Sequence, residues 1–129
     1  MTPHLDFLSI VVSDMAASTA FYRRLGLAFP EGSDGESHVE ATLPGGIRVA
    51  LDTEAVIRSF YPEWQASAEG GRIGMAFRCA DAAEVDSVFA DLTEAGYEGE
   101  LKPFDAVWGQ RYAVIKDPDG NGVDLYAPL

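Results

Sequence analysis

Acidic and amide side chains that could hold a calcium ion occur together near residue 120. Asp117, Asp119 and Asn121, followed by Gly122, match the first half of a calcium-binding loop. A complete loop needs a bidentate Glu at the position that Pro128 occupies, and this segment joins two expected strands instead of two helices. We therefore interpret it as a turn.

Two further motifs resemble reactive sites but lack the partners that such sites need. Cys79 could act as a nucleophile, yet it ends an apolar run and no partner histidine is evident, so the sequence favours a small buried side chain. Residues 44–46 are rich in glycine, but the Lys and the helix of a phosphate-binding loop do not follow. They predict a hairpin turn.

The composition favours one small globular domain. The 129 residues include 47% hydrophobic and 11% aromatic residues, enough to bury a core without disulfides. There is no positively charged start followed by an apolar run, and no stretch approaches the roughly 20 apolar residues that cross a bilayer. We expect a cytoplasmic protein with no membrane partner.

The charge balance restricts the partners. Lys and Arg number 9 and Asp and Glu number 21, which gives a net charge of −12 spread along the chain. Such a surface repels nucleic acid and anionic membranes, so neither is an expected partner. It would attract a cationic ligand, although acidity also serves solubility alone.

The first half of the sequence predicts a strand, a helix and a hairpin. Residues 5–12 are typical of a buried strand, and Asp14 is suited to cap the helix that follows. Gly26 is placed to end this helix. Segments 38–43 and 47–51 alternate as a hairpin does. The helix is expected to bury a stripe of Ser18, Phe21, Tyr22 and Leu25.

Two loops complete this half. Residues 31–35 form an acidic loop, and residues 54–71 form a long connection that ends with Gly70 and Gly71. The connection carries Phe60, Tyr61 and Trp64, and a connection of this length in a small domain usually has a function.

The second half repeats the order of elements. Residues 74–79 predict a strand, Asp81 a helix cap and Gly96 the end of that helix. Three more strands are predicted at residues 97–102, 111–116 and 123–126, and the helical stripe is Val85, Val88, Phe89 and Leu92.

Constant shifts relate the two halves. A shift of 67 residues carries the first helical stripe onto the second and Asp14 onto Asp81. A shift of 74 residues carries Pro44, Gly46, Val49 and Leu51 onto Pro118, Gly120, Val123 and Leu125. The sequence therefore predicts an internal duplication within one α+β domain, residues 1–129, with halves at about 1–60 and 68–129.

The chain resembles the glyoxalase, bleomycin-resistance and extradiol-dioxygenase superfamily. The resemblance lies in the duplicated βαβββ unit, in Ser13-Asp14 followed by residues 21–27, and in residues 116–125, which run from Lys-Asp-Pro-Asp-Gly to Asp-Leu. It implies two βαβββ modules that form a cupped mixed sheet, in a homodimer. The superfamily includes lyases, isomerases, oxygenases and binding proteins, so the resemblance alone does not fix a reaction.

The resemblance also implies four positions that hold a metal in metal-dependent relatives. They correspond here to Phe7, Ala50, Gly74 and Asp124, and only Asp124 has a side chain that can ligate. Catalytic zinc takes three protein ligands, and non-haem iron takes two histidines and a carboxylate. We expect no metal and no other cofactor. A shifted metal site built from His38, Glu40 or Asp52 on neighbouring strands remains the alternative.

We expect an aromatic pocket where relatives bind a metal. Phe7, Ala50 and Gly74 would leave an apolar floor, and planar ligands stack well on aromatic walls. Residues 108–112, ahead of Asp117-Pro118, are similar to the bleomycin-resistance branch, whose members are acidic, metal-free dimers that sequester an antibiotic. The residues expected to contact the small-molecule ligand are Phe7, His38, Ala50, Phe60, Trp64, Gly74, Phe104, Trp108, Tyr112 and Asp124.

Two other functions stay open at this point. In a metal-free isomerase or lyase, an apolar floor would raise the pKa of Asp124, which would then act as a general base, with His38 or Arg111 stabilising developing charge. A pure interaction module would have no small-molecule pocket. Sequestration of an aromatic, cationic compound by a homodimer is the interpretation that the sequence favours.

Overall fold

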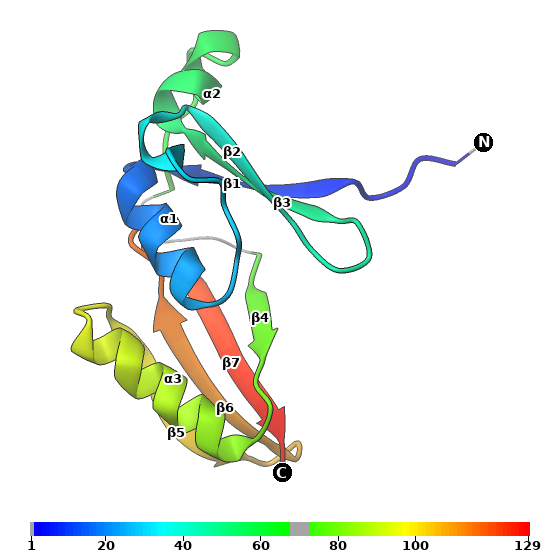
Figure 1. Cartoon of the computed structure of the whole chain (residues 1–129), viewed down its shortest axis with the longest axis vertical. Helices are drawn as coiled ribbons and strands as arrows, with labels where there is room; N and C mark the ends of the chain where they lie inside the picture. The colour runs from blue at the N-terminus through cyan, green and yellow to red at the C-terminus, as the bar shows by residue number, and fades with distance from the viewer. Residues whose placement is uncertain (1, 68–72) are drawn as a thin grey trace. The chain divides into compact units, whose positions relative to one another are not determined.

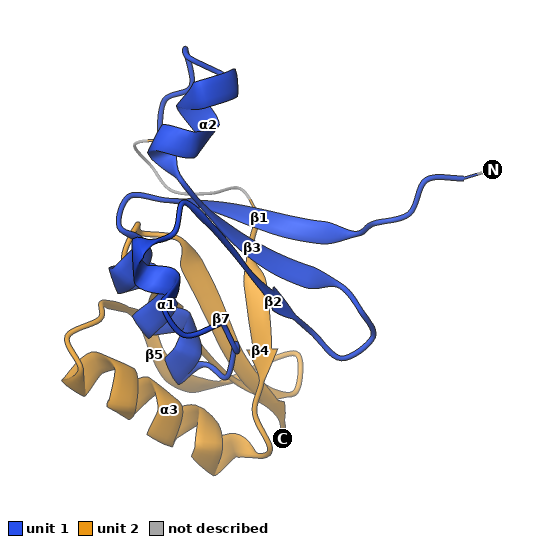
Figure 2. Ribbon diagram, turned by 45° about the horizontal axis from the view of Figure 1, so that its top comes forward, with its two compact units in different colours: residues 1–66 blue, residues 67–129 orange. Residues whose placement is uncertain are grey.

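The computed structural model describes residues 2–67 and 73–129, and the predicted glycine end of the long connection, Gly70-Gly71, lies outside them. The chain divides into two compact units, residues 1–66 (unit 1) and residues 67–129 (unit 2), which Figure 2 colours separately. The division falls between the two predicted repeat halves. That the whole chain behaves as one domain stays a prediction.

Unit 1 is a three-stranded mixed sheet with a crossover helix (Figure 1). Strand β1 (Phe7–Val12) runs parallel to β3 (Arg48–Thr53), and β2 (His38–Thr42) pairs with β3 as an antiparallel hairpin. Parallel strands need a long connection, which helix α1 (Met15–Arg24) and the 3₁₀ turn η1 (Ser33–Gly35) supply. The order β1-β3-β2 leaves both β1 and β2 at the edges.

Unit 2 repeats this plan with one more strand. Strand β4 (Met75–Arg78) lies parallel to β7 (Gly122–Pro128), and helix α3 (Ala82–Glu94) makes the first part of the crossover. Antiparallel β6 (Gln110–Lys116) and β5 (Gly99–Ala106) extend the sheet in the order β4-β7-β6-β5. Unit 2 is thus a βαβββ module, unit 1 is a βαβββ-like module that lacks one strand, and the predicted α+β class is confirmed.

Matching register and matching caps support the internal duplication. Ser9 pairs with Ala50 in unit 1, and Ala76 pairs with Asp124 in unit 2, so the shifts of 67 and 74 residues also relate the strand pairs. The Asp14 carboxylate accepts a hydrogen bond from the Ala17 amide at 3.1 Å. Asp81 does the same for the Glu84 amide at 2.8 Å, so both predicted helix caps are confirmed.

Unit 1 differs from unit 2 in the segment that corresponds to β5. Residues 27–37 include η1 instead of a strand, because their polar groups bond to α1. Thr19 Oγ1 donates to Asp34 Oδ1 at 2.9 Å, and Arg23 Nη2 donates to the Pro30 carbonyl at 2.9 Å. The predicted acidic loop is therefore partly helical.

The prediction of a long connection over residues 54–71 is wrong in its first part, which is a helix. Helix α2 (Glu54–Phe60) follows β3 directly. Thr53 caps it by accepting from the Val56 amide at 3.3 Å, and Arg58 pairs with Glu54 at 3.2 Å across one turn. The capping residue is present in the sequence, but the apolar periodicity of residues 54–60 is too weak to predict a helix.

Strands β5 and β1 differ most from their predictions. Strand β5 runs to Ala106, four residues beyond the predicted end, because its irregular pairing with β6 continues to Gln110. Strand β1 is not buried as a whole: only Val12 is buried, whereas Phe7 and Leu8 are exposed in the single chain. An apolar run predicted burial, but β1 lies at the edge of its sheet.

Alternating positions separate a buried face from an open face in each sheet. In unit 2, Val123, Leu125 and Ala127 are buried, and Gly122, Asp124 and Tyr126 alternate with them at half-buried positions. The open faces therefore carry the candidate functional groups. In the described part of the chain, no helix has the length and apolar character needed to span a membrane.

Candidate functional site

Three aromatic side chains meet on the open face of unit 2. Phe104 and Tyr112 are register partners on β5 and β6, and Trp108 lies in the turn between these strands. The ring centroids of Trp108 and Tyr112 are 5.4 Å apart, those of Phe104 and Tyr112 5.8 Å, and those of Phe104 and Trp108 6.3 Å. We call these three residues the aromatic corner.

The aromatic corner is presented outward. Trp108 is 58% exposed and Phe104 is 38% exposed, whereas Tyr112 is half-buried. Gly109 follows Trp108 with a φ of 90°, a left-handed conformation that glycine adopts without strain and that turns the chain back into β6. The Trp108 indole N–H donates to Gln110 Oε1 at 2.9 Å, which fixes the indole against the start of β6.

Asp124 lies beside the aromatic corner. Asp124 is on β7 and shares the open face of the sheet with Tyr112 on β6. Its register partner on β6 is Val114, two residues along the strand from Tyr112. Burial raises the pKa of the Tyr112 phenol to about 12, and a hydrogen bond to the Asp124 carboxylate contributes to this shift. The predicted set Phe104, Trp108, Tyr112 and Asp124 is thus brought together by the structure.

Arg111 points to the other face of this sheet. Its guanidinium bonds to Asp86 on α3 through Nε and Nη2, at 2.9 and 3.2 Å, and to Asp105 on β5 at 3.1 Å. The expectation that Arg111 assists Asp124 is therefore wrong, because neighbouring residues of a strand point to opposite faces.

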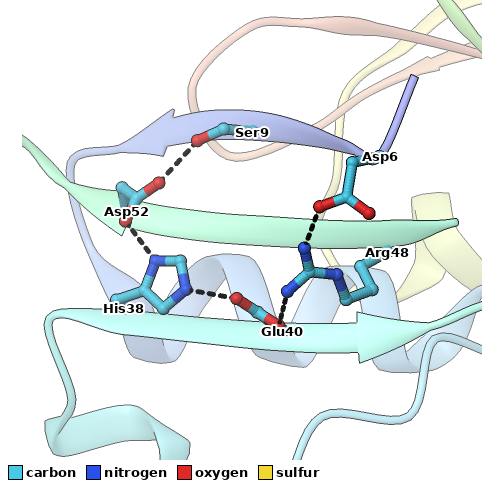
Figure 3. Close-up of polar contacts among 6 residues, drawn as sticks. All are labelled: Asp6, Ser9, His38, Glu40, Arg48 and Asp52. Carbon is cyan, nitrogen blue, oxygen red and sulfur yellow. Dashed lines mark hydrogen bonds and ion pairs between the residues drawn. The ribbon is translucent and has the colours of Figure 1, made fainter. Parts of the chain in front are cut away.

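A connected set of polar side chains covers the open face of unit 1 (Figure 3). Ser9 Oγ donates to Asp52 Oδ2 at 2.5 Å, and the other oxygen of Asp52 lies 2.5 Å from His38 Nδ1. His38 Nε2 lies 2.7 Å from Glu40 Oε2. Arg48 continues the chain by bonding to Glu40 Oε1 at 2.8 Å and to Asp6. We call these six residues the polar network.

His38 is the centre of the polar network. Its hydrogen bond to Glu40 and then its hydrogen bond to Asp52 raise the pKa of the imidazole above its ordinary value. The same hydrogen bonds favour the imidazolium form, in which both ring nitrogens donate. Hydrogen bonds from His38 and Arg48 lower the pKa of the Glu40 carboxyl.

The polar network replaces the expected apolar floor in unit 1. Ala50 is fully buried between its register partners Ser9 and Glu40, and the Arg48 guanidinium lies over one face of the Phe7 ring, 5.1 Å from its centroid. The prediction of hydrocarbon at this face is wrong because it considered single positions and not their charged neighbours. At Gly74 in unit 2, an added Cβ would meet nothing within 4 Å, as expected for open space.

The residues present do not fit a metal ion at the family's ligand positions. Phe7, Ala50 and Gly74 have no donor atom, and a fixed guanidinium cation over Phe7 opposes a second cation there. Asp124 alone cannot complete a coordination shell.

The alternative metal site at His38, Glu40 and Asp52 does not fit better. The three side chains do meet, but both ring nitrogens of His38 are already bonded to carboxylates, which favours the protonated ring over the neutral ligand that a metal requires. Across residues 2–67 and 73–129, no group of three or more His, Cys, Asp or Glu is arranged to hold a metal.

The remaining predicted aromatic residues lie at the end of α2. Phe60 is its last residue and is 72% exposed. Trp64 is half-buried, and the Arg58 guanidinium lies 5.3 Å from its ring centroid. Arg58 Nε also donates to the Trp64 carbonyl at 3.3 Å. An arginine of the same unit therefore already covers one face of the Trp64 ring.

Two predictions from isolated motifs are confirmed. Asp117 is buried and accepts from the amides of Asp119 and Asn121 and from the Asn121 side chain, at 2.8–2.9 Å, which builds the predicted turn. Cys79 is buried, as expected for a small side chain that packs in the interior, and this burial raises the pKa of its thiol.

The sequence prediction missed Asp6, Ser9 and Arg48. Alternation offered a signal for two of them, because Arg48, Ala50 and Asp52 share one face of β3, and Ser9 shares the face of Phe7 on β1. Asp6 precedes its strand, and no local pattern connects it with Arg48.

The fold and the sequence together define the family. A model of the glyoxalase/bleomycin resistance protein/dioxygenase superfamily matches residues 4–125. The chain belongs to this superfamily. The match covers both units and therefore the aromatic corner and the polar network.

Similar proteins span the whole chain. The chain is 30% identical to the uncharacterised protein YraH of Bacillus subtilis (strain 168), over 95% of this chain and 96% of that protein. A protein of Agrobacterium tumefaciens solved by solution NMR is 27% identical, with a TM-score of 0.75 and 99% of each chain covered. A family enzyme from Burkholderia phytofirmans has a TM-score of 0.81 at 18% identity, covering 98% of this chain and all of that one, which shows a shared fold.

Proposed function

We propose that the protein is a metal-independent binding protein of the bleomycin-resistance type, which sequesters an aromatic small molecule. The observation that carries this proposal is the aromatic corner, in which three rings contact one another on an outward-facing surface beside Asp124. Stacking on such rings contributes about 0.5–1.5 kcal/mol per aromatic pair beyond the burial of area.

The surroundings of Asp124 favour binding over proton abstraction. Its carboxylate is the hydrogen-bond partner of the Tyr112 phenol, so one of its acceptor positions is already taken. Arg111, one of the two groups expected to assist it, bonds to Asp86 and Asp105. The described groups near Asp124 thus support recognition better than general-base catalysis.

We also propose that the ligand is enclosed by a homodimer. Apolar side chains remain exposed in the single chain, among them Leu5, Phe7 and Leu8 before and within β1. Exposed apolar surface of this kind is typical of an interface. Sedimentation equilibrium should give the mass of two chains, and a monomer at micromolar concentration would contradict this part of the proposal.

An NMR titration with a neutral aromatic compound tests the binding function. The probe is 3-tert-butylphenol, and the signal followed is the indole N–H resonance of Trp108. This resonance is assigned by its absence from the spectrum of Trp108→Ala. We expect saturable shifts of this signal and of the amides in β5 and β6, and a loss of affinity of about tenfold in Trp108→Ala.

Val107→Ala provides the matched control. Val107 is the exposed apolar neighbour of Trp108, so its removal should change the affinity by less than about twofold if stacking on Trp108 dominates. A wild-type protein that shows no saturable shift with this probe would contradict the proposed function. Equal losses in both variants would contradict the role of the aromatic corner.

A further inference from the structure

We propose that the aromatic corner recognises a quaternary ammonium group, a nitrogen cation with four carbon substituents and no N–H. This inference rests on the proposed function and names the chemical class of its ligand. Four observations on the described residues support it: the ring geometry, the absence of a described cation at these rings, the carboxylate beside them and the engaged polar atoms of the rings.

The ring planes of the aromatic corner are nearly perpendicular in all three pairs. The interplanar angles are 89° for Phe104 and Trp108, 82° for Phe104 and Tyr112, and 77° for Trp108 and Tyr112. Three such planes are related as the faces at a corner of a box. A compact cation can approach several negatively polarised ring faces within about 6 Å there, the arrangement that recognises quaternary ammonium ligands.

Among the described residues, arginines lie over aromatic rings of unit 1 but not over those of this corner. Arg48 lies over Phe7, and Arg58 lies over Trp64, at 5.1 and 5.3 Å from the ring centroids. Within residues 2–67 and 73–129, no arginine or lysine stacks on Phe104, Trp108 or Tyr112. An external cation would therefore meet no competing cation from the described residues at these ring faces.

Asp124 provides a negative charge without a cationic partner in the described part of the chain. Its hydrogen bond comes from a phenol, whereas Glu40 and Asp52 bond to His38, and Asp86 and Asp105 bond to Arg111. A half-buried carboxylate of this kind favours a cation nearby. The net charge of −12 adds a general attraction.

The polar atoms of the corner favour a quaternary over a primary ammonium. The Tyr112 hydroxyl donates to Asp124, and the Trp108 indole N–H donates to Gln110. A primary ammonium would lose strong hydration and would need acceptors for three N–H groups. A quaternary ammonium has no N–H to satisfy, so ring faces and one carboxylate are sufficient.

The experiment compares two probes of nearly the same shape. (3-Hydroxyphenyl)trimethylammonium carries a permanent positive charge, and 3-tert-butylphenol replaces its nitrogen by carbon. Both are titrated into the full chain at pH 7 and about 0.15 M salt, which screens distant charges. We expect the cation to bind at least about tenfold more tightly, as followed by the Trp108 indole signal. Phenethylamine, a primary ammonium, should bind more weakly than the quaternary probe.

Two variants separate the corner from general charge attraction. Asp124→Asn should remove most of the preference for the cation while 3-tert-butylphenol still binds. Glu94→Gln removes one charge from α3, on the covered side of the sheet, and should keep the preference. The amide spectrum of each variant checks that it is folded.

The outcomes distinguish this inference from the proposed function. If neither probe binds, both fail. If both probes bind equally, the quaternary ammonium inference fails and aromatic binding stands. A preference that survives Asp124→Asn and Trp108→Ala, or falls equally in Glu94→Gln, would arise from diffuse charge and would also overturn the inference.

Discussion

His38 Nδ1 and Asp52 Oδ1 lie 2.5 Å apart across the β2–β3 pair, and Glu40 holds the second ring nitrogen of His38. This relationship links the edge strand of unit 1 to its central strand through a titratable group. It predicts how the stability of the protein changes with pH.

The pKa of His38 should be measurably raised. Hydrogen bonds to Glu40 and Asp52 stabilise the imidazolium in the folded state, so its folded pKa lies above the unfolded value of about 6.5. The stabilisation is complete below that unfolded value and is lost as the pH rises through the folded pKa. NMR titration of the His38 ring and thermal unfolding between pH 6 and 9 check this.

Glu40→Gln tests whether the hydrogen bonds raise the pKa of His38, because the hydrogen bond to Glu40 makes the largest contribution to this increase. The variant should lower the pKa of His38 toward its ordinary value, whereas Glu31→Gln, in an exposed segment, should leave it unchanged. An unchanged pKa of His38 in Glu40→Gln would refute the polar network as its cause.

The Tyr112 phenol should ionise only near pH 12. Burial and then the Asp124 carboxylate raise its pKa from 10, so the folded state keeps a proton that the unfolded state releases. The resulting stabilisation is present below pH 10 and is lost as the pH rises toward 12. Ultraviolet difference titration of wild type against Tyr112→Phe isolates this phenol, and Asp124→Asn should lower its pKa only in part because burial remains.

Gly99→Ala should destabilise the protein by about 1–3 kcal/mol. A Cβ at Gly99 would lie 2.5 Å from Cζ of the buried Phe89 ring and 3.3 Å from Cγ2 of Thr93, so α3 would have to shift away from β5. Urea unfolding measures the difference. Gly74→Ala is the control, because its Cβ meets nothing within 4 Å, and comparable losses in both variants would refute the packing argument.

Asp117→Ala should cost at least about 2 kcal/mol of unfolding free energy. It removes the acceptor of two amides and one side-chain N–H in the turn before β7, and Asp117 is buried. Because the segment is a turn, millimolar calcium should not change the melting temperature of the wild type. A calcium-dependent increase would favour the cation-binding interpretation of residues 117–122.

Chelation should leave the folded protein unchanged. The donor set at Phe7, Ala50, Gly74 and Asp124 is too small for a metal, and His38 is engaged by two carboxylates. We expect the melting temperature and the affinity for 3-tert-butylphenol to be the same before and after dialysis against EDTA. Stoichiometric zinc, iron, nickel or manganese, with binding lost on chelation, would contradict this.

Much of the fold was predictable because its signals are local. The caps Asp14 and Asp81 act on amides three residues away, and Gly26 and Gly96 follow the two main helices with φ values of 92° and 101°. The aromatic corner was also predictable, since Phe104, Trp108 and Tyr112 belong to one hairpin.

The sequence by itself determined the duplicated α+β plan, the helix caps, the final turn and the composition of the aromatic corner, because each depends on residues close along the chain or on a pattern that recurs at a constant shift. Only the tertiary structure decided what covers the open face of unit 1. Ser9 meets Asp52 across 43 residues and Arg48 meets Asp6 across 42, and both contacts require the order β1-β3-β2 and its register. Side chains on different strands become partners only when strand order and register place them on one face, which no local pattern specifies.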